Sequence, residues 1–357
     1  MAYGIINADQ ITPSVAGSSI GAGNASLMKN RLINSAMVID QRNAGASVTP
    51  TGSAYTLDRW QFQCTQSSKM SIQQVLANGP VGFQSYVALG SLSAYSVGAG
   101  DFFAFVQKVE GFNTADLQWG TANAKTVTLS FWVNCTLTGT FGGSITNSAG
   151  NRSYPFTYTV SAANTWQQIS ITIAGDTTGT WIGATNGTGL VLYLGMGVGS
   201  TYSGTAGAWA SANYVSATGA TSVVGTSGAT FYITGVQLEV GSSATGFEYR
   251  QYGQELALCQ RYFEKIGGSG GSDIFFGTGA VGAGYDAYST IGFNASKRAI
   301  PTVTKVGTWS VVNCSQPIVA ASNLNTMTIV TSSTAGSGQV YTLTNGTSTY
   351  LTASAEL

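Results

Sequence analysis

Aromatic side chains in a glycine-rich stretch are the first candidates for chemistry. Tyr202, Trp209 and Tyr214 stand among small residues between positions 195 and 228. A flat ring on a loop can pack against the apolar face of a hexose, while Asn, Gln and Thr side chains bind the hydroxyls. Loops of this length are usually functional or disordered. We expect these rings to contact a glycan or a neighbouring subunit; the alternative is that they hold the loop on its own domain.

Catalytic carboxylates are the second possibility. Cleavage of a glycosidic bond needs two carboxyl groups that face the same bond, and Asp101, Glu110 and Asp116 are close in sequence. Nothing in the sequence fixes them in one cleft. Histidine is absent, which removes Ser-His-Asp and Cys-His catalysis and most catalytic zinc sites. We therefore predict that the protein is not an enzyme.

Metal binding and cysteine chemistry are the remaining possibilities for a chemical function. Asp58, Asp101 and Glu239 could hold a structural calcium ion, because Ca²⁺ prefers carboxylate oxygens; no other cofactor is expected. The cysteines are widely separated and form no CxxC motif, and we expect them to be buried thiols that act as small hydrophobic residues. The cysteine positions are Cys64, Cys135, Cys259 and Cys314.

Short strands separated by Gly, Asn and Ser turns must position these residues. The clearest is predicted over Thr126–Val133, where Val127 and its alternate neighbours face one way while Trp132 faces the other. The stretch Thr230–Tyr249 predicts the last strand of a large sandwich, with a bulge at Gly235. Further strands are predicted over 58–65, 70–76, 85–89, 102–109, 143–147, 156–160, 167–173 and 190–194. In the C-terminal part they are predicted over 274–276, 288–293, 302–306, 310–312, 327–331, 341–344 and 349–352.

These elements predict an all-β protein with three parts. Residues 1–45 form an extended N-terminal segment for docking and oligomerisation, and residues 46–253 form a jelly-roll β-sandwich. Residues 254–357 form a short helix, from about Gln254 to Lys265, and a second, smaller β-sandwich. Leu256, Cys259, Tyr262 (or Phe263) and Ile266 recur at helical spacing.

Composition and charge exclude several partners. Hydrophobic residues make up 43% of the 357 residues, enough for a sizeable core, and the formal net charge is +0. Without a basic excess, a nucleic-acid partner is not expected. No apolar run approaches the roughly 18 residues of a spanning helix, so membrane insertion is not expected. The N-terminus lacks a basic region followed by an apolar one, so no signal peptide is expected.

Several strings resemble one class of protein. They are NRLINSAMVIDQRNAG, VTLSFWV, NSAGNRSYPFTY, GVQLEVGSSATGFEYR and ELALCQRYFEK, and they cover the chain from Asn30 to about Val303. Together they resemble bacteriophage tail-fibre and other virion structural proteins that contain a jelly roll like that of carbohydrate-binding modules. The resemblance implies a homo-oligomer, with a trimer expected, and a location in the virion after synthesis in the host cytoplasm.

The first hypothesis is therefore a fibre or tail-tip component without enzymatic activity. Its N-terminal segment would attach to other virion proteins, and its sandwiches would present loops to a glycan of the host surface. The second hypothesis is a capsid or neck decoration protein, or head fibre, with a purely structural role. The third is a polysaccharide-degrading tailspike, which the absence of a parallel β-helix repeat argues against.

Overall fold

The computed structural model describes residues 28–268, 270, 274–278, 282–334, 340–344 and 346–357. It divides into two compact units. The first contains residues 28–38, 45–56 and 60–250, and the second contains residues 39–44, 57–59 and 251–357. Most of the predicted N-terminal docking segment lies outside the described residues. Its remainder contributes residues to both units.

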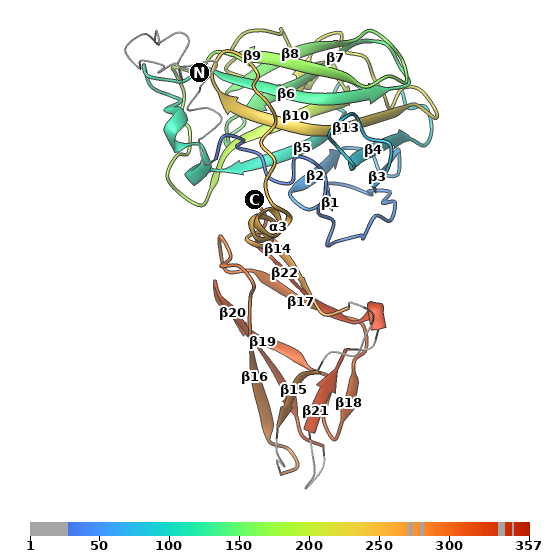
Figure 1. Ribbon diagram of the computed structural model, residues 1–357, viewed down its shortest axis with the longest axis vertical. Helices are drawn as coiled ribbons and strands as arrows, with labels where there is room; N and C mark the ends of the chain where they lie inside the picture. The colour runs from blue at the N-terminus through green and yellow to red at the C-terminus, as the bar shows by residue number, and fades with distance from the viewer. Residues whose placement is uncertain (1–27, 269, 271–273, 279–281, 335–339, 345) are drawn as a thin grey trace, which may run out of the picture. The chain divides into compact units, whose positions relative to one another are not determined.

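The first unit is a sandwich of two antiparallel sheets (Figure 1). The five-stranded sheet has the order β3 (Met70–Val75), β4 (Tyr86–Ser91), β13 (Thr230–Val240), β6 (Val127–Cys135), β9 (Gln167–Ile173). The six-stranded sheet has the order β1 (Ala54–Leu57), β2 (Trp60–Cys64), β5 (Phe102–Glu110), β10 (Thr188–Val198), β7 (Gly139–Thr146), β8 (Ser153–Val160). The predicted all-β class, with a large sandwich, a short helix and smaller sheets, is confirmed.

Period-two alternation builds the core of this sandwich. Phe131 on β6 and Phe231 on β13 are buried, and they meet Tyr158 and Phe141 of the other sheet at ring-centroid distances of 5.0 and 6.0 Å. Alternate residues of a strand point to opposite faces, so Trp132, the neighbour of Phe131, faces away from the core as predicted.

The strand β13 lies in the middle of its sheet and carries the predicted bulge. Gly235 has a φ of +61°, and the pairing with β6 shifts register between Thr234 and Gln237. Strand β4 pairs only with the first part of β13, up to Ile233. Beyond that point residues 30–35 take the place of β4: the Arg31 amide donates to the Leu238 carbonyl at 3.0 Å. The NRLINS string therefore completes the sheet.

The long glycine-rich stretch folds over the outer face of the six-stranded sheet. It contains the 3₁₀ helix η4 (Ser200–Tyr202) and the short parallel pair β11 (Ser203–Gly204) and β12 (Ser216–Ala217). Val215 packs in an apolar cluster with Ala104, Val106 and Val191 of β5 and β10. This stretch is thus an ordered covering layer of the first unit.

The C-terminal stretch of the second unit, residues 251–357, starts with the helix α3 (Tyr252–Gln260), which is shorter than predicted. The predicted last turn is wrong: β14 (Phe263–Ile266) instead pairs with β22 (Tyr350–Ser354). Three three-stranded antiparallel sheets follow, in the orders β14-β22-β17 (Thr302–Val306), β15 (Ile274–Thr278)-β21 (Val340–Leu343)-β18 (Ser310–Val312) and β16 (Asp286–Gly292)-β20 (Thr326–Ser332)-β19 (Ile318–Ser322). Trp309, Met327, Ile329 and Leu351 form its core.

Residues 39–44 and 57–59 bring buried charge into the second unit. Both Arg42 and Arg59 form ion pairs with Glu356. Their guanidinium groups lie 3.6 Å over the ring of Phe263 and 3.5 Å over the ring of Tyr262. Arg–aromatic stacking of this kind stabilises a guanidinium that is removed from water.

Candidate functional site

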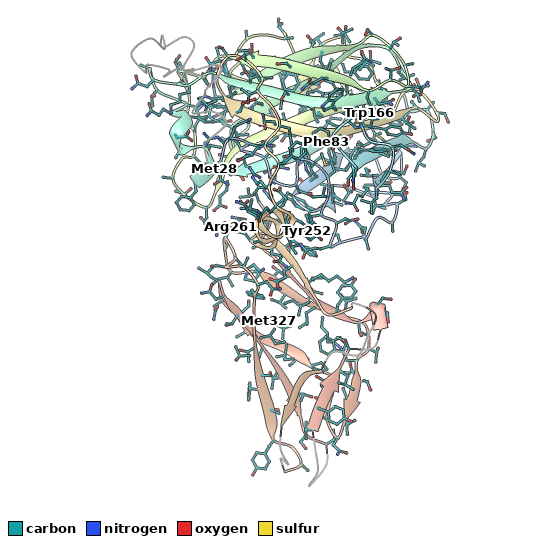
Figure 2. All side chains as sticks on the ribbon, in the orientation of Figure 1. Met28, Phe83, Trp166, Tyr252, Arg261 and Met327 are labelled. Atoms are coloured by element: carbon teal, nitrogen blue, oxygen red, sulfur yellow. The ribbon has the colours of Figure 1, made fainter. Side chains whose placement is uncertain are left out.

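Three aromatic rings meet on the outer face of the five-stranded sheet. They are Tyr86 on β4, Tyr232 on β13, and Trp166, which directly precedes β9 and is labelled in Figure 2. The ring centroids are 5.1 Å apart for Tyr86 and Tyr232, 5.4 Å for Tyr86 and Trp166, and 6.4 Å for Trp166 and Tyr232. The tyrosines occupy outward positions of their strands because their neighbours Val87, Phe231 and Ile233 face the core. Tyr232 and Trp166 are half-buried, and they cover Tyr86, which is only 9% exposed.

Amide side chains flank this aromatic triangle. In the register of the sheet, Gln73 of β3 lies opposite Ala88 of β4, Ala88 lies opposite Tyr232, and Tyr232 lies opposite Asn134 of β6. Gln73 is exposed, while Ala88 and Asn134 are half-buried. Adjacent strands are about 4.8 Å apart, so this row spans about 14 Å. The result is an apolar centre, whose rings are inclined to one another by 40 to 73°, with hydrogen-bonding groups at its margins.

A second row of side chains, next to the first on the same sheet face, forms the other margin of the triangle. Trp132 of β6 is opposite Thr234 of β13 and Gln168 of β9. Trp132 is half-buried, and Gln168 is exposed. The indole of Trp166 is fixed by its N–H, which donates to the carbonyl oxygen of Asn78 at 3.2 Å. Fixed rings lose little conformational freedom when a ligand binds.

The surface carries hydroxyl groups and no formal charge at its centre. Burial, with a smaller contribution from Tyr232, raises the pKa of Tyr86. Its hydroxyl is therefore protonated at neutral pH and can both donate and accept a hydrogen bond. Such a surface suits a neutral, hydroxyl-rich ligand better than an ion.

The other half of the same sheet face is closed. Gln237 and Glu239 on β13 are buried, and the chain that follows β13 supplies their partners. Glu239 accepts hydrogen bonds from Gln237 Nε2 at 2.9 Å and from the amide and hydroxyl of Thr245 at 2.8 and 2.6 Å. The open aromatic surface is therefore confined to the part of β13 that pairs with β4.

The three carboxylates predicted to share a calcium ion lie in different places. Asp58 is in the second unit and accepts hydrogen bonds from the backbone amide and the side-chain amide of Gln41, at 2.7 and 2.6 Å. Asp101 is in a turn before β5, where hydrogen bonds from Tyr95, Gln66 and Thr65 lower its pKa to about 2. No group of three or more potential ligands for a metal occurs in the described part of the chain. The predicted trio is therefore wrong as a shared site, because each carboxylate binds its own local donors.

The three predicted aromatic residues are also dispersed. Tyr202 packs on Phe102, with ring centroids 5.2 Å apart, in the apolar cluster of the covering layer. The ring of Tyr214 lies over Gly204, where a Cβ would come within 2.2 Å of it. Trp209 contacts Trp119, Trp181 and Tyr154 instead. The structure holds the loop on its own domain through these residues, and a glycan or subunit contact remains a prediction.

The aromatic triangle could have been found from one signal. Tyr86 and Tyr232 occupy outward positions of strands whose alternate residues are strongly apolar, and polar residues are usual at such positions. Their convergence with Trp166 depends on strand order, which the sequence does not show. The four cysteines are free; Cys135, Cys259 and Cys314 are buried, and Cys64 is half-buried.

Comparison with protein-family models finds no match, and comparison with curated proteins finds none either. Among solved structures, the chain is similar to the enzymatically active domain of tailspike protein 4 of bacteriophage CBA120, with 13% identity and a TM-score of 0.33 over 60% of this chain and 22% of that one. It is similar to the family 11 carbohydrate-binding module of a cellulosomal cellulase of Clostridium thermocellum, with 10% identity and a TM-score of 0.27 over 56% of this chain and 100% of that one.

A third similarity is to the CBM22-1 and GH10 modules of xylanase 10B of Clostridium thermocellum, in complex with xylohexaose. The identity is 16% and the TM-score 0.28, over 57% of this chain and 30% of that one. This chain thus spans less than a third of the tailspike and xylanase structures that it matches. All three TM-scores are below 0.5, so the function proposed below rests on the side chains of this chain.

Proposed function

We propose that the chain is a fibre or tail-tip component of a bacteriophage virion that binds a neutral glycan of the host surface and cleaves nothing. The observation that carries glycan binding is the triangle of Tyr86, Trp166 and Tyr232 with amide side chains at its margins. Aromatic faces pack on the apolar faces of sugar rings, and amides bind the hydroxyls around them. The row of about 14 Å across strands is long enough for more than one sugar ring.

The virion assignment rests on the sequence strings that resemble phage proteins. NRLINSAMVIDQRNAG and GVQLEVGSSATGFEYR, which carry that resemblance, lie side by side in the structure: Leu238 N–H donates to Asn30 Oδ1 at 3.1 Å. Residues 1–27, which would attach the chain to other virion proteins, lie outside the described residues. No helix of the described chain is long and apolar enough to cross a bilayer. We place the protein in the virion, after synthesis in the host cytoplasm.

Self-association into a trimer is part of the same proposal. The second unit exposes large apolar side chains, among them Tyr285 and Ile300 at 69% each and Ile318 at 62%. Exposed apolar groups of this kind are often covered by a partner. Several weak glycan sites on one particle would act together through their high effective concentration. Light scattering that shows a stable monomer at micromolar concentration would argue against this part.

Binding of host glycans by matched variants tests the central claim. Replacing one stacking ring costs about 0.5–1.5 kcal/mol, so Tyr232→Ala should weaken binding about 2- to 12-fold. Phe112→Ala removes an exposed ring, 54% accessible, from the opposite end of the sandwich and serves as the control. Equal affinity of Tyr232→Ala and the parent protein, with both folded by near-ultraviolet circular dichroism, would refute a sugar site on this face.

Two further measurements separate the alternative functions. A capsid or neck decoration protein should show no preference between glycans of susceptible and resistant host strains. A tailspike should release reducing sugars from host polysaccharide, and we expect no release.

A further inference from the structure

A loop between β3 and β4 borders the aromatic triangle. We call residues 76–83 of this connection the wall loop. Its first residue, Leu76, directly follows Val75, which lies opposite Tyr86 in the register of the sheet. The carbonyl oxygen of Asn78 accepts the indole N–H of Trp166 at 3.2 Å. One side of the wall loop is therefore attached to a ring of the triangle.

The opposite side of the wall loop packs on the closed half of the same sheet face. The ring of Phe83, labelled in Figure 2, lies 5.0 Å from the ring of Phe247 and 5.5 Å from that of Tyr249, measured between centroids. Both of these residues belong to the chain that follows β13. Phe83 also lies at the bulge of β13, where a Cβ on Gly235 would come within 2.6 Å of its ring. The wall loop thus separates the open aromatic surface from the covered part of the face.

Hydrogen bonds and close contacts fix the conformation of the wall loop. The Phe83 amide donates to the carbonyl of Pro80 at 2.9 Å, and the Tyr249 hydroxyl donates to the carbonyl of Gly82 at 3.0 Å. A Cβ on Gly79 would come within 2.2 Å of the Phe83 carbonyl oxygen, so the turn closes tightly. These carbonyl groups already accept hydrogen bonds from the protein. A loop that is fixed in this way loses little conformational freedom when a ligand binds.

Two aliphatic side chains of the wall loop are exposed beside the rings. Val81, in the turn, is 95% exposed, and Leu76 is 67% exposed. In contrast, Tyr86 is 9% exposed, and Tyr232 and Trp166 are half-buried. Exposed apolar groups that gather at one place on a surface often mark a site of contact. A ligand on the triangle would therefore meet aliphatic groups at this margin and amide groups at the others.

The segments that build this surface carry no charge. Asp, Glu, Lys and Arg are absent from positions 70–100, 126–151, 153–175 and 177–238, which supply β3, β4, β6, β9 and most of β13. An ionic group of a ligand would find no counter-charge on these segments. A hydroxyl group placed against the aliphatic side chains would lose water without gaining a hydrogen bond, which is unfavourable. A methyl group in the same place would remove apolar surface from water, which is favourable.

We propose that the wall loop selects neutral pyranoses that carry a methyl group, either at C6 of a 6-deoxyhexose or in an acetyl substituent. This inference rests on the glycan site proposed above and adds the class of sugar that the site prefers. The sugar ring packs on Trp166 and Tyr232, and its methyl group contacts Val81 or Leu76. Burial of one methyl group increases the affinity about 4-fold.

Matched pairs of sugars test this preference. D-fucose differs from D-galactose in having a methyl group in place of the hydroxymethyl group, and N-acetylglucosamine differs from glucose in having an acetamido group in place of a hydroxyl. Titrations of 5-fluorotryptophan-labelled protein, followed through the fluorine resonance of Trp166, give the Kd of each sugar, and Trp166→Phe assigns that resonance. At least one methyl-bearing sugar should bind about 4-fold more tightly than its partner. The pair that shows the preference identifies the source of the methyl group, and equal affinities within both pairs would overturn the proposal.

Substitutions that keep the shape of the side chains then locate the methyl group. Val81→Thr combined with Leu76→Asn makes the wall loop polar, and both positions are so exposed that the protein should still fold. The affinity ratio of the preferred pair should fall from about 4 toward unity in this double variant. Val240→Thr is the matched control, because Val240 is also exposed but is the last residue of β13. An unchanged ratio in the folded double variant would overturn the assignment.

Failure of the glycan site itself gives a different result. If no sugar of either pair shifts the Trp166 resonance, glycan binding on this face is refuted, and the preference with it. If the sugars bind but the methyl group makes no difference, only the inference about the wall loop fails. A double variant with an unchanged sugar ratio but altered light scattering would show that the wall loop contacts another copy of the chain, which also overturns the proposal.

Discussion

The buried carboxylate of Asp58 should make the stability of the second unit depend on pH in an unusual direction. Asp58 is fully buried, and desolvation raises its pKa from 3.8 to about 6, while Arg42 and the hydrogen bonds from Gln41 act in the opposite sense. Because the folded pKa is above the unfolded one, the folded state binds the proton more tightly. The stabilisation that the protonated Asp58 carboxyl gives to the folded state is complete below about pH 4. It falls as the pH rises to about 6 and does not change further above that.

The magnitude follows from the two pKa values. The change from 3.8 to about 6, at about 1.4 kcal/mol for each pH unit, amounts to about 3 kcal/mol. In Asp58→Asn the group no longer titrates, so the parent protein should lose most of this amount, about 2.4 kcal/mol, relative to the variant between pH 4 and pH 7. Other carboxylates, including Asp101, titrate equally in both proteins and cancel in the difference.

Trp309 is a specific reporter for this measurement. It is buried, and no other tryptophan occurs between positions 251 and 357. Urea unfolding of 5-fluorotryptophan-labelled protein, followed through the Trp309 resonance at several pH values, gives the free energy of unfolding of the second unit. Asn at position 58 disturbs the hydrogen bonds from Gln41, so a constant offset between the proteins is expected. A difference that does not change between pH 4 and pH 7 would refute the reasoning.

Two further predictions concern single buried positions. Gly235→Ala should destabilise the first unit by about 2–4 kcal/mol, because it combines a left-handed backbone with a Cβ 2.6 Å from the Phe83 ring; Gly228→Ala has a similar φ but open space, and should cost only about 1–2 kcal/mol. Denaturant midpoints for the two variants check this, and equal midpoints would contradict it. Lys297→Met should cost about 3–5 kcal/mol, because it leaves the Glu264 carboxylate buried without its ion-pair partner. Adding Glu264→Gln should restore part of that loss, and a double variant no more stable than the single one would show that the ion pair is not the cause.

The sequence predicted the positions of the strands better than it predicted which of their side chains are buried. In β9, Ile169, Ile171 and Ile173 alternate as expected, yet only Ile173 is fully buried. The reason is that β9 is at the edge of its sheet and pairs with β6 on one side alone. A polar substitution at Ile171 should therefore be milder than its pattern suggests. Edge or central position depends on which strands pair, and that is not a local property.

The helix and the long loop also depend on contacts with distant parts of the chain, which the local sequence does not show. Leu256 and Cys259 lie in a helix, but the periodic pattern continued to Ile266 and could not show that Phe263 pairs with Ser354 instead. The stretch from 195 to 228 consists mostly of small residues, so its packing across β5 and β10 was not predictable. Helical and strand periods coincide over a few residues, and only a distant partner decides between them.

Local pattern alone determined the all-β class, the bulge at Gly235 and the outward direction of Trp132, because alternation, glycine and turn residues act within a few positions of the chain. Tertiary structure alone decided which aromatic residues meet. Tyr86, Trp166 and Tyr232 converge because β4, β13 and the start of β9 belong to one sheet. Binding surfaces here are assembled from side chains up to about 150 positions apart in sequence, and their contact is a consequence of strand order, which no short segment contains.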